Sequence, residues 1–170
     1  MRYACYGLIF VAALALQSAG PPGLVLFGVQ PQLVLLIALL SGMIEGPVSG
    51  AIFGFMGGLF QDLLTGRFIG LGAVATMCAA LGLGLAGRRL YKENLLVRFF
   101  TILGGTLAAQ LLYLLGKAAF GLAIPWSPLI WKTLLGVGLL NGLISIVLFR
   151  PLMFLNRRII YWDELLKRTG

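Results

Sequence analysis

The sequence predicts an all-α membrane protein with six transmembrane helices. Of its 170 residues, 60% are hydrophobic and only 11% are charged, and histidine is absent. A soluble domain of this length could not bury so many apolar side chains, because one compact core leaves much of its surface in water. A bilayer removes that difficulty by acting as an apolar solvent. No polar stretch is long enough for a second domain, so we expect residues 1–170 to form one integral membrane domain.

Six apolar stretches come close to the length of about 20 residues that a helix needs to cross the hydrocarbon layer. Breaks rich in glycine, proline or charge separate them. The break at Gly46-Pro47 is so short that it predicts a tight helical hairpin. We expect the first span to be retained, because residues 15–18 do not fit a signal-peptide cleavage site. The expected spans are residues 3–19, 28–44, 48–65, 70–87, 95–117 and 129–149.

The basic residues predict the orientation of these spans. With a cytoplasmic N-terminus, only Arg67, Lys117 and Lys132 lie outside. The other basic residues then lie inside, and such an excess of Lys and Arg is typical of cytoplasmic loops. We therefore expect both termini in the cytoplasm. The net charge of +8 is interpreted as membrane anchoring rather than nucleic-acid binding, since the charges sit at the ends of apolar segments. The inside residues are Arg2, Arg88, Arg89, Lys92, Arg98, Arg150, Arg157, Arg158, Lys167 and Arg168.

Residues 152–168 mix apolar, basic and acidic side chains. Tyr161 and Trp162 supply amphipathic rings that suit the headgroup region. The segment is interpreted either as an extension of the last helix or as a short helix on the cytoplasmic membrane surface. A frayed tail is the remaining alternative.

Glycine recurs every four residues through the second and third spans, and Asp62 takes the next step of the series. Small residues at this spacing let helices approach closely in lipid. The stripe either packs within the chain or receives a partner's helix.

Glu45 falls at a cytoplasmic turn, whereas Asp62, near the outer end of its span, could pair with Arg67 or cap the following turn. The candidate packing or interface residues are Glu45, Gly46, Pro47, Gly50, Gly54, Gly58, Asp62, Gly66 and Gly70.

Catalysis is not expected. A serine intramembrane protease needs a base, usually histidine, and the sequence has none. An aspartyl protease needs two carboxylates in one site, but Glu45 and Asp62 are predicted near opposite membrane faces. Cys5 and Cys78 are far apart and show no metal or disulfide spacing. No phosphate-binding glycine loop appears, and no cofactor is expected.

The segment from Ser41 to Gly72 resembles the MreD family, the membrane component of the bacterial cell-elongation (rod-shape) machinery. The length and span count also match. One departure is Pro31-Gln32, where the family often has an acid after the proline. The residues that carry the resemblance are Gly46-Pro47, Gly50, Gly54-Phe55, Gly57-Gly58-Leu59, Asp62-Leu63-Leu64, Gly66, Gly70-Leu71-Gly72, Arg88-Arg89-Leu90-Tyr91 and Glu93-Asn94.

The resemblance implies a non-catalytic scaffold of the bacterial inner membrane that supports lateral peptidoglycan synthesis and cell shape. Its expected partner is the single-span protein MreC, and through it MreB, RodA and the partner transpeptidase. The family's fold is similar to the six-helix substrate-binding subunits of energy-coupling-factor transporters. That similarity supplies the alternative function, a ligand-binding subunit for vitamin uptake. Such a pocket needs convergent polar groups, and the spans offer few, chiefly Thr76, Thr106, Gln110 and Asn141.

Overall fold

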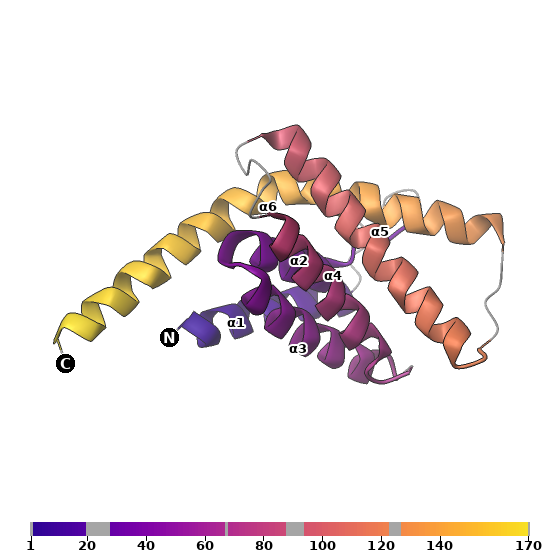
Figure 1. The fold of residues 1–170 in the computed structure, drawn as a ribbon, viewed down its shortest axis with the longest axis horizontal. Coiled ribbons are helices and arrows are strands. Elements are labelled where there is room, and N and C mark those ends of the chain that lie inside the picture. Colours follow the sequence, from indigo (N-terminus) through magenta and orange to yellow (C-terminus); the bar gives the residue numbers. More distant parts are fainter. Residues whose placement is uncertain (1, 20–27, 67, 88–93, 123–126, 170) are drawn as a thin grey trace.

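The computed structural model describes residues 2–19, 28–66, 68–87, 94–122 and 127–169, and these form an all-helical architecture. Their arrangement is shown in Figure 1. Residues 7–17 of the first helix and the second and fourth helices are shorter apolar segments. Three segments are long and apolar enough to cross a membrane: Pro47–Thr65, Leu95–Ala119 and Pro128–Arg158. The elements are α1 (Arg2–Ala19), α2 (Leu33–Glu45), α3 (Pro47–Thr65), α4 (Leu71–Gly87), α5 (Leu95–Ala119) and α6 (Pro128–Thr169).

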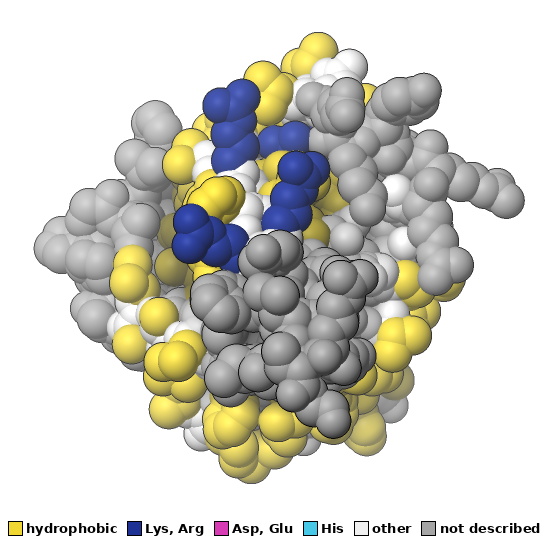
Figure 2. Space-filling model, turned by 90° about the vertical axis from the view of Figure 1, so that its left-hand side faces the viewer, with side chains coloured by type: hydrophobic (Ala, Val, Ile, Leu, Met, Phe, Trp, Pro, Cys, Tyr) yellow, Lys and Arg dark blue, Asp and Glu magenta, His cyan; other side chains and the backbone are white. Residues whose placement is uncertain are grey.

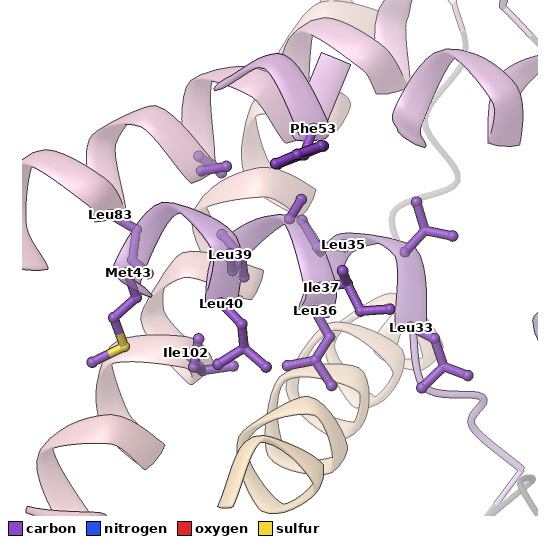
Figure 3. Close-up of a cluster of buried hydrophobic side chains, with 14 of the residues drawn as sticks. Leu33, Leu35, Leu36, Ile37, Leu39, Leu40, Met43, Phe53, Leu83 and Ile102 are labelled. Atoms are coloured by element: carbon purple, nitrogen blue, oxygen red, sulfur yellow. The ribbon is translucent and has the colours of Figure 1, made fainter. Parts of the chain in front are cut away.

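Helix α2 is the central element of the fold. Every residue from Leu33 to Met43 is buried, and α2 contacts all five other helices. Its apolar side chains radiate in several directions, and Figure 3 shows them among Phe53 of α3, Leu83 of α4 and Ile102 of α5. A helix that is apolar on all sides and surrounded by other helices has no lipid-facing stripe. The other helices therefore form a shell around α2.

Helix α2 begins later than expected, at Leu33 rather than near residue 28. Gly28 has a left-handed φ of +78°, and proline at position 31 biases the residue before it toward extended backbone. Both features oppose a helix that starts before Pro31. Val29 is nevertheless buried, in a small cluster with Val137 and Leu140 of α6. This non-helical stretch is therefore partly covered by protein, with Val29 and Pro31 buried and Gly28 and Gln30 exposed.

The α2–α3 hairpin has the tight turn that the sequence predicted. Gly46 alone separates the two helices, with a φ of +112° that favours glycine. Pro47 follows as the first residue of α3, where its missing N–H costs no helical hydrogen bond. The turn is completed when the N–H of Gly46 donates to the carbonyl of Gly42, at 3.1 Å.

Helix α6 continues through Pro151 and reaches Thr169, 42 residues in all. This has the form of an extension of the last helix rather than a separate short helix or a frayed tail. At 1.5 Å per residue the helix is about 63 Å long, roughly twice the thickness of a hydrocarbon core. Pro151 removes a backbone donor, and Figure 1 shows α6 changing direction on its way to the end that carries both termini.

That end of the molecule is basic. Figure 2 views it directly and shows Lys and Arg side chains gathered there, with no acidic side chain visible among the described residues. The α6 side chains of Arg150, Arg157 and Arg158 are exposed. Arg98 of α5, expected to be one more surface charge, is instead buried, with its guanidinium carbon 3.6 Å from the centre of the Phe149 ring. This stacking contact links α5 to α6.

Candidate functional site

The glycine stripe of α3 packs against α4 within the chain. A Cβ on Gly54 would lie 2.9 Å from the carbonyl oxygen of Thr76, and one on Gly58 would lie 2.7 Å from the Cα of Ala73. Both separations are too short for any side chain larger than hydrogen. The two backbones therefore touch along this line, as small residues permit in lipid. Of the two readings of the stripe, these contacts correspond to intramolecular packing.

A third helix joins this contact near the hairpin. A Cβ on Gly50 would meet the Cα of Gly42 of α2 and would lie 3.1 Å from the carbonyl oxygen of Ala80. On α4, a Cβ on Gly84 would lie 2.5 Å from the Cα of Pro47. Glycine thus appears on all three helices where they cross. The two remaining candidate glycines, Gly66 and Gly70, have φ values of +63° and +98° and serve the connection between α3 and α4.

Asp62 caps the N-terminus of α4. Its carboxylate Oδ2 accepts hydrogen bonds from the backbone N–H of Gly70, at 2.9 Å, and of Ala73, at 3.1 Å. Gly70 immediately precedes α4 and Ala73 lies in its first turn, where N–H groups have no partner within the helix. The positive end of the helix dipole also stabilises the buried negative charge. A Cβ on Gly72 would meet the Asp62 carboxylate, so the cap depends on glycine there as well.

The two acids occupy separate sites, as expected. Glu45 ends α2, and Asp62 lies 15 residues beyond the start of α3 at Pro47, which is about 22 Å along a helix axis. They cannot form a carboxylate dyad. The alternative role of Asp62, a pairing with Arg67, involves a residue outside the described part of the chain. No group of three or more His, Cys, Asp or Glu residues that could hold a metal ion occurs in the part of the chain that the structure describes.

The N-terminus of α2 is held by side chains from two other helices. Asn141 of α6 accepts a hydrogen bond from the backbone N–H of Gln32, at 3.1 Å, and its amide lies 3.4 Å from the Gln32 carbonyl oxygen and from the Thr106 hydroxyl. The side-chain oxygen of Gln17 accepts from the N–H of Val34, at 3.2 Å. Sequence reasoning noted Asn141 and Thr106 only as polar residues. Asn141 contacts a backbone 109 positions away, and Thr106 contacts the Asn141 side chain, neither of which a local pattern indicates.

Above this cluster lies a cavity of about 740 Å³ between α3, α4, α5, α6 and the start of α2. Part of its wall is polar, including Gln61 and Asp62 of α3, Gln110 and Lys117 of α5 and Thr133 of α6. Leu35, Leu134 and Val137 supply apolar wall. Of these side chains, only Gln110 was named from the sequence as a candidate pocket group. Only the fold places the ends of five helices around one space, which we call the terminal cavity.

Comparison with known proteins identifies the family. The family described as rod shape-determining protein MreD matches residues 2–159, nearly the whole chain. The chain belongs to the MreD family. Membership implies a role in the determination of rod shape, and the family is one of structural membrane proteins. No curated protein and no solved structure matches the chain, so the likeness to energy-coupling-factor subunits stays a prediction. Nothing in the comparisons supports the alternative of a vitamin-type transporter subunit.

Proposed function

We propose that this MreD-family chain is a non-catalytic scaffold of the cell-elongation complex in the bacterial inner membrane. It binds the single-span protein MreC and, through it, MreB, RodA and the partner transpeptidase. Membership of the family supports this role. So does the chemistry of the spans, where Glu45 and Asp62 lie apart and Asp62 caps a helix.

One observation indicates where a partner's helix would dock. The glycines of α3 are already covered by α4, but α4 carries a second line of small residues on its opposite, exposed side. Cys78, Gly82 and Ala86 recur there every four residues. A Cβ on Gly82 would meet nothing within 4 Å. A single transmembrane helix can approach closely along such a line without burying charge. We therefore assign the MreC contact to this face of α4.

Replacement of Gly82 by leucine tests the assignment. The new side chain has room in the isolated chain, so the protein should fold normally. It would hold a docked helix away, and we expect at least a tenfold loss of co-purified MreC and a shift from rods to round cells. Gly104→Leu is the matched control, since Gly104 is an equally open glycine on the exposed side of α5.

Two outcomes would contradict the proposal at different levels. Normal MreC recovery with Gly82→Leu would show that α4 is not the docking face. If the wild-type chain never retains MreC and its depletion leaves cells rod-shaped, the scaffold role itself is wrong.

A further inference from the structure

The terminal cavity has the dimensions of a ligand site. Its 740 Å³ falls within the range of about 300–1,000 Å³ that is usual for pockets that hold small molecules. Described residues of five helices line it. By contrast, the backbones of α3 and α4 touch where these helices cross, and no space is left between them. A space of this size is therefore a feature of one end of the bundle rather than general loose packing.

Gln110 supplies a buried polar group that no described residue satisfies. Its side chain lines the cavity, and its amide nitrogen Nε2 is buried with no hydrogen-bond partner among the described residues. A buried donor without an acceptor destabilises a protein, and native structures rarely leave one unexplained. An acceptor oxygen on a bound molecule would satisfy it.

Lys117 gives the cavity its charge. It lies two helical turns beyond Gln110 on α5, and its ammonium is 5.1 Å from the Tyr113 ring centre and 5.7 Å from that of Phe68. No acid of the described residues forms an ion pair with it. Asp62 also lines the cavity, but the N–H groups of Gly70 and Ala73 compensate its carboxylate. The site therefore favours an anion.

The remaining wall is apolar, at Leu35, Leu134 and Val137, so the occupant needs a hydrophobic part as well. We propose that the terminal cavity binds an anionic amphiphile, with its phosphate or carboxylate at Lys117, an acceptor oxygen at Gln110 and its apolar part against these three side chains. The cavity lies at the end of the bundle expected to face the outer leaflet, where membrane lipid is the abundant molecule of this chemistry. This inference does not rest on binding of MreC.

Native mass spectrometry of the full chain, delipidated in detergent, tests the proposal with dioleoylphosphatidylglycerol as the probe. The wild-type chain should bind it at least tenfold more tightly than dioleoylphosphatidylcholine, whose headgroup has no net charge. Lys117→Gln should remove that preference. Lys132→Gln is the matched control, because Lys132 is an exposed lysine at the same end of the bundle that does not line the cavity. Equal affinities for Lys117→Gln and wild type would overturn the proposal.

Gln110→Leu provides a second, independent test of lipid binding in the cavity. It replaces an unpartnered buried amide with an apolar side chain of similar size, so thermal stability without lipid should be unchanged or higher. Affinity for phosphatidylglycerol should nevertheless fall several-fold. A drop in stability without a drop in affinity would contradict the role given to Gln110. A parallel titration with glycerol 3-phosphate separates the sources: tight binding would assign the site to a water-soluble anion, and weak binding would assign it to a membrane lipid.

Discussion

Asp62, Asn141 and Gln17 each supply a hydrogen-bond acceptor to the start of a helix other than their own. Hydrocarbon offers no water to the unpaired N–H groups of a helix end, so these groups must find partners inside the protein. For Asp62 the sequence predicted this kind of role, because an acid near the end of an apolar span needs compensation. The receiving residues, Gly70 and Ala73, could not be named, since the turn between α3 and α4 decides which N–H groups come within reach.

Substitution of Asp62 measures the strength of the cap. Asp62→Ala leaves the N–H groups of Gly70 and Ala73, at the start of α4, without this acceptor, and we expect it to lower the free energy of unfolding by about 2 kcal/mol. Asp62→Asn keeps one acceptor oxygen and should lose about half as much. Thermal unfolding in detergent measures both, and Gln61→Ala, on the neighbouring residue of α3, is the control. Equal stability of Asp62→Ala and wild type would show that the cap contributes nothing.

The sequence predicts where helices begin and end better than it predicts how they are arranged in space. The bounds of α1, α3, α4 and α5 lie within about two residues of those expected, because glycine, proline and charge act locally. The central position of α2 could not be predicted. Lipid tails are as apolar as leucine, so high hydropathy does not distinguish a helix surrounded by protein from one surrounded by lipid. The same limit left both readings of the glycine stripe open until the α3–α4 contact was seen.

Leucine placed at two glycines separates packing inside the chain from packing against a partner. Gly54→Leu should force α3 and α4 apart, because even a Cβ there would lie within 3.1 Å of two backbone atoms of Met77. We expect loss of folded protein in detergent, or destabilisation of several kcal/mol. Gly82→Leu, on the open side of α4, should unfold like wild type. A fully stable Gly54→Leu would show that α3 and α4 do not meet along this stripe.

The two ends of the molecule differ in charge and in shape. Lys and Arg side chains gather at the end that carries both termini (Figure 2). The opposite end holds the terminal cavity, around which the C-terminal parts of α3 and α5 meet the N-terminal parts of α2, α4 and α6. Helices that alternate in direction across a bilayer place their ends in this way. The sequence predicted the alternation from its basic residues. The cavity itself depends on side-chain packing among five helices and had no local signal.

This arrangement links the predicted membrane sides of the helix ends to one another. Reporter fusions after Arg168 and at Asn94 should behave as cytoplasmic, and fusions at Gly23, Arg67 and Ser127 as external. Thr65 of α3, Lys117 of α5 and Ser127 just before α6 all line the terminal cavity, so the ends of these helices must lie on the same side of the membrane. Lys117 and Lys132 oppose that orientation through the positive-inside preference. A cytoplasmic reading at Ser127 with an external reading at Arg67 would contradict the six-span order and the cavity together, because no bilayer could separate residues that line one space.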